Sequence, residues 1–236
     1  MRGRIALAEG AIQSSQLTAD GRDASPADQR AWHLLSLDWD DSVVGCVRML
    51  VHPCRARFES LMVSHTKLAT SPDTSSALRS AVESEMQRAQ MAGAPVVEVG
   101  GWVLDESVRG SVEAIRLALG VWAWGRLLGG AIGIATATVR NSSAHMLGRI
   151  GGRPLEHDGA ALPPYFEPKY GCDIQMLRFD SNSFTRRFAP IVESMCSELC
   201  QSPVFSTVDQ STSSLLALCA AIQAHQPQPM LAGFAS

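Results

Sequence analysis

The chain has 236 residues, of which 46% are hydrophobic, and a formal net charge of −3 at pH 7. This length is sufficient for one domain with a sizeable core. The slightly acidic balance excludes the clustered basic face that nucleic-acid-binding proteins present. Residues 100–187 hold 10 basic and 8 acidic side chains, and no lysine or arginine follows. This mildly basic middle region would suit a small anionic partner.

The apolar stretch over residues 117–139 is about as long as a membrane span. Arg126 lies near its middle and glycines interrupt it, so a buried helix, a Gly-Gly turn and a central strand explain it better. The start of the chain has no sustained apolar run typical of a signal peptide. No CxxC, HxH or HExxH spacing occurs. We therefore expect a cytoplasmic protein with no transmembrane segment and no metal site.

In chain order, the first elements are a polar segment and a β-hairpin. Residues 1–30 lack clear periodicity and have room for one short helix, in ALAEGAIQSS. Two strands follow, in AWHLLSLDWD and SVVGCVRMLVHP, around a turn at residues 40–42. Residues 54–72 are irregular. Apolar residues at helical spacing then predict an amphipathic helix over residues 74–92.

After Pro95, strands and helices alternate. The turn-rich segment PPYFEPKYGC interrupts this alternation. The expected elements are a strand over 96–104, a helix over 112–128, a strand over 131–139, a helix over 142–150, a strand in DIQMLRFDS, and helices over 189–200 and in SSLLALCAAIQA. This order predicts an α/β (α+β) fold with a mixed central sheet flanked by helices. We expect one domain over residues 1–188 and a C-terminal helical extension or tail over 189–236.

The joint between a strand and the long helix contains Arg109, Gly110 and Ser111. Exposed N–H groups at a helix start, beside a glycine that lets a ligand approach, form an anion site. A pyrophosphate or a phosphopantetheine would fit there. An ordinary solvated loop has the same pattern, so this reading stays open.

Two charged residues stand within apolar strands. Glu98 follows two valines, and partial burial raises a carboxyl pKa toward the range of a general base for an attacking amine. A solvated strand face is the alternative for Glu98. Arg48 also needs a partner if it is buried. It pairs with a carboxylate such as Glu98, or it binds the carboxylate of an amino-acid substrate.

The order of these features resembles the GNAT superfamily of acyltransferases. In that superfamily a hairpin, a Glu-bearing strand, an Arg/Gly-rich loop that opens a long helix, another strand and an Asn-led helix follow one another. VVGCVRMLVHP and VVEVGGWVL resemble strands of acyl-homoserine-lactone (autoinducer) synthases. NSSAHMLGRIGGRPLE and PPYFEPKYGCDIQMLRFDS are similar to bacterial N-acyl amino acid synthases of the FeeM type. The resemblance covers roughly residues 20–182, with residues 1–30 as an abbreviated N-terminal segment.

The resemblance implies an N-acyltransferase. It would move a fatty acyl group, expected to be long, from the phosphopantetheine arm of acyl-carrier protein to the amine of an amino acid or related small molecule. A coenzyme A thioester is the less favoured donor. Glu98 would act as the general base or position the amine, and Arg48 would hold the acceptor. The groups that would bind the thioester oxygen and the phosphopantetheine are Trp102, Val103, Leu104, Arg109, Gly110, Ser111 and Asn141.

One part of the GNAT pattern is missing. Many GNAT enzymes have a tyrosine acid in the Asn-led helix, but spacing from Asn141 places Gly148 there. Tyr165 or Tyr170, in an aromatic and proline-rich loop, would substitute for it or close over the acceptor. Two alternatives stay open. One is an N-acetyltransferase that uses acetyl-coenzyme A, and the other is a non-catalytic GNAT-like binding protein in which Glu98 has no access to a cleft.

Overall fold

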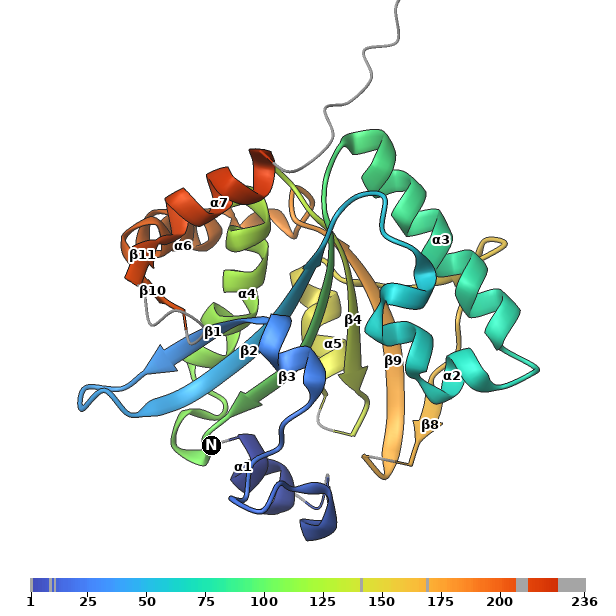
Figure 1. The fold of residues 1–236 in the computed structure, drawn as a ribbon, viewed down its shortest axis with the longest axis horizontal. Helices are drawn as coiled ribbons and strands as arrows, with labels where there is room; N and C mark the ends of the chain where they lie inside the picture. Colours follow the sequence, from blue (N-terminus) through green and yellow to red (C-terminus); the bar gives the residue numbers. More distant parts are fainter. Residues whose placement is uncertain are drawn as a thin grey trace, which may run out of the picture.

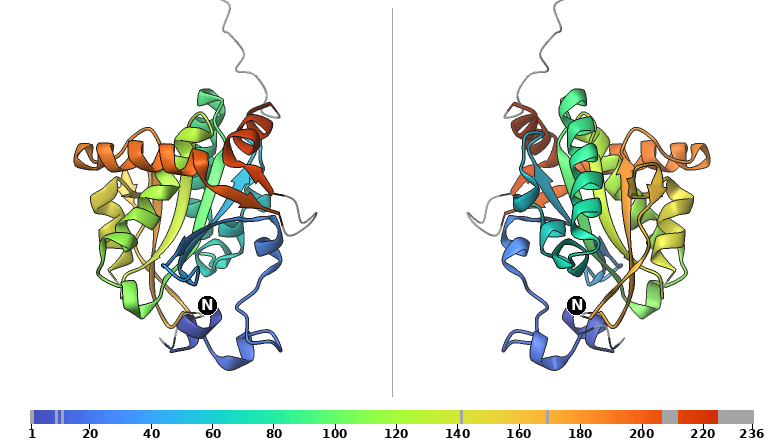
Figure 2. Two further views of the ribbon diagram at one scale, coloured as in Figure 1. Left: turned by 90° about the vertical axis from the view of Figure 1, so that its left-hand side faces the viewer. Right: turned by 90° about the vertical axis from the view of Figure 1, so that its right-hand side faces the viewer.

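The structure is a computed structural model that describes residues 2–8, 10, 12–140, 142–168, 170–206 and 212–224. In this part of the chain a seven-stranded mixed sheet has helices on both faces (Figures 1 and 2). The expected α/β class with a mixed central sheet is therefore confirmed. Among the described residues, no helix is both long enough and apolar enough to cross a membrane.

The sheet has the strand order β1-β2-β3-β4-β9-β5, and β8 also pairs with β9. Its strands are β1 (Trp32–Leu37), β2 (Val43–His52), β3 (Val96–Leu104), β4 (Ile132–Thr138), β5 (Arg153–Pro154), β8 (Tyr165–Glu167) and β9 (Cys172–Asp180). The pair β3–β4 is parallel, and the other neighbours are antiparallel. The long α4 (Val112–Leu127) connects the parallel pair, as a parallel crossover requires.

Two apolar cores lie on opposite faces of the sheet. On one face, α2 (Lys67–Thr70) and α3 (Ser75–Ala92) cover Val96 and its neighbours. On the other face, α4 and α5 (Ser143–Ile150) pack against Val97 and Val99. The alternation along β3 produces this division, because successive strand residues point to opposite faces. The helix layers stand apart in the side views (Figure 2).

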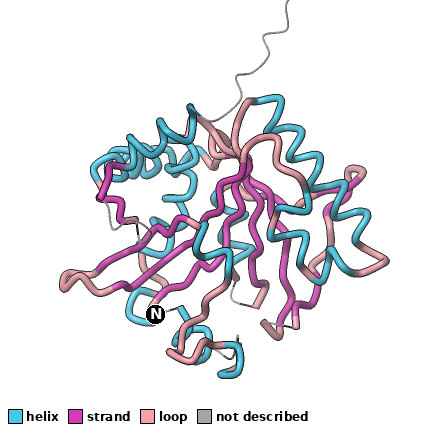
Figure 3. The backbone as a smooth tube through the Cα atoms, viewed as in Figure 1, coloured by secondary structure: helices cyan, strands magenta, loops and turns pink. Residues whose placement is uncertain are grey.

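The remaining helices lie at the two ends of the chain. At the C-terminal end, α6 (Ala189–Gln201) packs along α4, and α7 (Leu215–Ala224) packs on α6. The short strands β10 (Pro203–Phe205) and β11 (Thr212–Ser214) pair with each other. At the N-terminal end, α1 (Arg2–Ala8) and the 3₁₀ turn η1 (Ser14–Gln16) lie below the sheet (Figure 3), and the 3₁₀ turn η2 (Pro26–Arg30) lies against β2.

The hairpin, the three α-helices and two strands from residue 75 to 150, and the last strand are confirmed, with ends that differ from expectation by at most three residues. Shorter elements differ from expectation. Residues 54–72 are ordered as η3 (Phe58–Ser60), η4 (Met62–His65) and α2, and PPYFEPKYGC contains β8. Unpredicted pieces include β5, β6 (Glu156–His157), β7 (Ala160–Ala161) and η5 (Glu106–Val108), and the first helix ends at Ala8. Elements of one turn or two residues are too short to show a period.

Candidate active site

The strands β3 and β4 separate halfway along their length. They pair from Val96 opposite Ile132 to Val99 opposite Ala135, and then diverge (Figure 1). Beyond this point β3 pairs only with β2, and residues 136–138 of β4 pair only with β9. Two strand edges therefore face each other with backbone N–H and C=O groups that make no ladder bonds. Such groups need partners, and a ligand with amides can supply them.

A β-bulge in β3 directs side chains into this gap. The register of β2 against β3 shifts between Cys46 and Arg48, and Gly101 has a φ of +61°. An extra residue in one strand reverses which side chains face the core after it. As a result Trp102 and Leu104 lie on the same face as Val99, packed against the α4 core. The glycine is needed there because a positive φ is strained in other residues.

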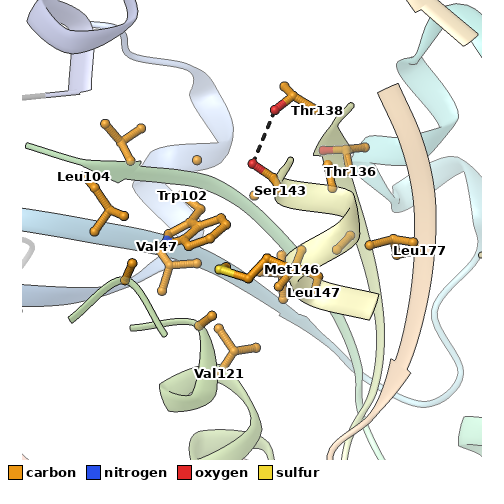
Figure 4. A pocket seen from close by; sticks show the side chains of 18 of the residues that line it. Val47, Trp102, Leu104, Val121, Thr136, Thr138, Ser143, Met146, Leu147 and Leu177 are labelled. Atoms are coloured by element: carbon orange, nitrogen blue, oxygen red, sulfur yellow. Dashed lines mark hydrogen bonds between the residues drawn. The ribbon is translucent and has the colours of Figure 1, made fainter. Parts of the chain in front are cut away.

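The gap opens into a cavity of about 590 Å³ between β3, β4, α4 and α5. Figure 4 shows Val47, Trp102 and Leu104 on one side of it, and Leu147 and Leu177 on the other. Polar groups are concentrated near its mouth, where the Ser143 and Thr138 hydroxyl oxygens lie 3.3 Å apart (Figure 4). A mostly apolar cavity of this volume, with polar groups at one end, is typical of a small-molecule site.

The start of α4 forms one side of the mouth. Arg109, Gly110 and Ser111 all line the cavity, as the sequence suggests. The Ser111 hydroxyl caps α4 by accepting a hydrogen bond from the Glu113 N–H, and the Arg109 Nε donates to the Leu104 carbonyl at 3.3 Å. The position of a Cβ on Gly110 has no other atom within 4 Å. A ligand can therefore approach the backbone of this loop closely.

The N-terminal segment forms the opposite side of the mouth. Arg2 and Asp23 line the cavity and form an ion pair with an Nε–Oδ2 distance of 2.9 Å. Behind them Asp28 accepts hydrogen bonds from both Arg2 and Arg48. Burial acts to raise the pKa of Asp28, but the two guanidinium groups outweigh it and hold that pKa well below its usual range. Arg2, Arg48, Asp23 and Asp28 thus form a cluster in which two cations are paired with two anions.

Arg48 has a carboxylate partner, as expected, but the partner is Asp28 and not Glu98. The Arg48 Nη1 lies 2.9 Å from Asp28 Oδ1 and also donates to the Ser25 hydroxyl. Its other arm lies beside Gly100, where a Cβ would be 3.6 Å from Nη2. Arg48 is not among the cavity-lining residues. It contacts the site through the backbone of the glycine pair in β3.

Glu98 lies on the opposite face of the sheet from the cavity. Its Oε1 accepts a hydrogen bond from the Val63 N–H at 2.8 Å, and its Oε2 accepts one from the Met62 N–H at 2.7 Å. The His52 Nε2 is 2.9 Å from the same Oε2. The two N–H groups begin η4, so the carboxylate caps that turn. Glu98 is not among the cavity-lining residues, and its side chain is 9% exposed.

The two candidate tyrosines also lie apart, one at the cavity and the other on the α3 face of the sheet. Tyr170 lines the cavity near its mouth. Tyr165 packs in the core on the α3 face, and burial together with the charge of Glu167 raises the pKa of its phenol above the usual value. Asn141 lies outside the described residues. The structure therefore brings together Trp102, Val103, Leu104, Arg109, Gly110, Ser111 and Tyr170 at one cavity, without Glu98, Arg48 or Tyr165.

Sequence reasoning missed several residues of the site. Arg2, Asp23 and Asp28 stand in a polar segment without a periodic pattern, and only folding places them beside Arg48. Thr138 is the last residue of β4 and Ser143 the first of α5, so both border a loop, which is a usual position for binding side chains. Among the described residues, no group of three or more His, Cys, Asp or Glu is arranged to hold a metal ion.

No family model matches the chain, and no curated protein does. Solved structures are similar, including the CoA-dependent acyl-homoserine lactone synthase BjaI with SAM and isopentyl-CoA, with a TM-score of 0.54 and 14% identity over 93% of this chain and 88% of that chain. BjaI with MTA gives 0.53 and 15% at the same coverage. The N-acyl amino acid synthase FeeM from uncultured soil microbes gives 0.48 and 12% over 77% of this chain and 87% of its own. The BjaI comparison shows that the chain has the same overall fold as that synthase.

Proposed function

We propose that the chain is an N-acyltransferase that moves a fatty acyl group from a phosphopantetheine thioester to the amine of an amino acid or related small molecule. The observation that carries this proposal is the joint position of three features. The unpaired edges of β3 and β4, the start of α4 and an apolar cavity of about 590 Å³ are continuous with one another. A thioester arm with amides, an anionic end and an apolar acyl chain has the matching order of groups.

The favoured donor is acyl-carrier protein. The pantetheine amides would pair with the strand edges, and its phosphate would lie at Arg109 and Gly110. Residues 105–113 carry one arginine and the three acidic residues Asp105, Glu106 and Glu113. Coenzyme A brings a pyrophosphate and a further phosphate, and an acidic balance disfavours that much negative charge. The single phosphodiester of a carrier arm suits this loop better.

The reaction at this site is an aminolysis of the thioester. The neutral amine nitrogen attacks the carbonyl carbon, the C–S bond breaks, and the proton of the amine passes to the departing sulfur, which gives an amide and a free thiol. Backbone N–H groups on the free edge near Trp102 and Val103 would stabilise the oxyanion that forms. The apolar walls exclude water and so suppress hydrolysis of the thioester.

The acceptor would enter beside the N-terminal segment. Asp23 and Arg2 lie at this side of the mouth and offer one anionic and one cationic group to an amino acid. Arg48 would act indirectly, because its charged end is engaged by Asp28 and Ser25. Its role in this proposal is to hold Asp28, and thereby Arg2, in place.

A second candidate is a protein that binds acyl thioesters without catalysing transfer. The observation that favours it is the place of Glu98, whose carboxylate is fully engaged by η4 and His52 away from the cavity. A direct role of Glu98 as the base would require these hydrogen bonds to open. The N-acetyltransferase alternative is less well supported, because the apolar cavity is larger than an acetyl group needs.

The test uses the purified chain with acyl-carrier protein or coenzyme A carrying short or long acyl groups, together with a mixture of amino acids. Mass spectrometry should find long-chain N-acyl amino acids and free carrier thiol. Arg109→Ala should raise KM for the donor roughly five- to tenfold with little change in kcat, since one phosphate contact contributes about 1 kcal/mol. Arg116→Ala, at a half-buried arginine of the same helix that does not line the cavity, is the matched control.

The results separate the candidates. Acetyl products alone would support the N-acetyltransferase. Saturable binding of the donor without any product would establish the second candidate. The absence of both binding and product would reject an acyl-thioester function altogether.

A further inference from the structure

The cavity ends at a wall formed chiefly by one side chain. Along α4 the lining residues recur at helical spacing, from Ser111 at the mouth through Ala118 to Trp122. At 1.5 Å per residue this stripe extends about 16 Å into the protein. The same stripe continues through Gly125 to Leu128, but these residues line a second, separate space. That space is too small to hold a water molecule.

Along strands β2 and β3, too, the lining passes from the first cavity to the second space at the next residue on the same face. In β2, Val47 lines the first cavity, whereas Met49 and Val51 line the second. In β3, Val99 lines the first and Val97 the second. The second space is therefore the continuation of the first, one step deeper in the sheet. Val121 and Phe179 line both, so they form the partition.

Phe179 occupies this partition because β4 has a glycine at that level. Ala137 and Ala135 of β4 line the first cavity, and Ala131, directly before β4, lines the second space. Between them stands Gly133, which is opposite Phe179 in the strand register. A Cβ on Gly133 would lie 1.9 Å from the Phe179 ring, so the ring lies directly over the glycine. No other residue type would allow this position.

The ring is also held from the helix side. Its centroid lies 4.8 Å from that of Trp122, with an interplanar angle of 41°. Phe179 is 5% exposed and Trp122 is 2% exposed. A ring clamped between a glycine backbone and a buried indole has no free space for rotation, since protein interiors are closely packed. It therefore acts as a fixed stop at the inner end of the cavity.

We infer that Phe179, seated on Gly133, is the residue that limits the length of the acyl chain, and that a smaller side chain there joins the two spaces and admits longer chains. This inference rests on the proposed function for its choice of ligand. An acyl chain that enters from the mouth runs along α4 and meets the ring with its methyl end. Chains beyond that length must displace buried aromatic groups, so their added methylenes are not accommodated.

The experiment is calorimetric titration of the full chain with S-alkyl pantetheine thioethers of increasing chain length, which have no thioester carbonyl and therefore bind without reacting. In the wild type, affinity should rise about fourfold with each methylene and then stop rising at a limiting length. Phe179→Ala should move that limit to longer chains, again with about fourfold per added methylene. Phe179→Leu keeps more of the packing and covers the case in which the alanine variant does not fold.

Leu128→Ala is the matched control, because Leu128 lines only the second space and the partition remains intact. Its limiting length should equal that of the wild type. An unchanged limit in folded Phe179→Leu and Phe179→Ala, or an equal shift in Leu128→Ala, would overturn the inference. Binding does not require turnover. If the variant's limiting chain length shifts but the protein makes no amide product, the proposed transferase is rejected while the role of Phe179 as the end of the cavity is supported.

Discussion

The two faces of the sheet use the same strands for different purposes. On the α3 face the core is filled, and the buried Glu98 has hydrogen-bond partners on both carboxylate oxygens. On the α4 face the separation of β3 from β4 and the small residues of β4 leave a cavity of about 590 Å³. We call the α3 face the solid half and the α4 face the hollow half. The adjacent residues Glu98 and Val99 thus belong to different halves. The comparison teaches that the hollow half offers strand edges and apolar walls to a ligand, while the strand charges Arg48 and Glu98 are paired within the protein.

The largest expected effect on ligand binding comes from filling the hollow half. Ala118 is 3% exposed and lines the middle of the cavity. Ala118→Phe should weaken binding of a long acyl-pantetheine about 100-fold, which corresponds to three or four methylenes at about 0.8 kcal/mol each. Titration measures the affinity, and circular dichroism checks the fold. Ala92→Phe, the same change at an exposed position, should bind as the wild type does. Equal binding by Ala118→Phe would place the acyl chain elsewhere.

The solid half is tested by removing its carboxylate. Glu98→Ala leaves the Met62 and Val63 N–H groups without their acceptor, and each buried unsatisfied donor costs about 1–3 kcal/mol. We expect the free energy of unfolding to fall by about 3 kcal/mol, as measured by urea denaturation. Glu83→Ala, at an exposed ion pair, should change it by less than about 0.5 kcal/mol. A Glu98→Ala protein that is as stable as the wild type but inactive would instead support a role of Glu98 as the general base.

The bulge that directs side chains into the hollow half gives a smaller effect. Gly101→Ala places a Cβ on a residue with a φ of +61°, which costs about 1–2 kcal/mol. It also brings that Cβ to 3.3 Å from the Arg2 guanidinium. Gly148→Ala is the control, because it lies within α5 with open space around it and should stabilise the protein slightly. A neutral Gly101→Ala would show that the bulge is not required.

The smallest effect concerns the ion cluster at the mouth. The pKa of Asp28 is depressed in the folded chain, so its ionised form contributes stability above the unfolded pKa of about 3.9 and loses it as pH falls toward the folded value. The difference in unfolding free energy between the wild type and Asp28→Asn should therefore be constant near neutral pH and shrink below about pH 4. A difference that grows in acid would contradict this assignment.

The architecture could be predicted because its long elements have strong periods. The helix at residues 75–92 and the strand at 96–104 follow from apolar spacing alone. The face of each strand residue could not be predicted, because an alternating strand has two equivalent readings until its neighbours are known. The sequence therefore did not assign Glu98 to the filled face. The bulge at Gly101 adds a second uncertainty, since it reverses the faces of Trp102 and Leu104 within one strand.

Contacts between residues far apart in the sequence could not be predicted either. Asp28 lies 20 residues before Arg48, in a segment without a period, and Phe179 meets Gly133 only because β9 is antiparallel to β4 in that register. Local pattern carries no information on either pair. The loop at Arg109, which lines the cavity, could be singled out from the sequence because its pattern is contained in three consecutive residues at a helix start.

The most direct test of the account is to locate the end of a bound acyl chain. An acyl-pantetheine with a photoreactive diazirine at its terminal carbon would be bound, irradiated and mapped by mass spectrometry of the peptides. The account predicts saturable adducts on the α4 peptide around Val121 and Trp122 and on the β9 peptide around Phe179. Adducts confined to α3, on the face that contains Glu98, would contradict it.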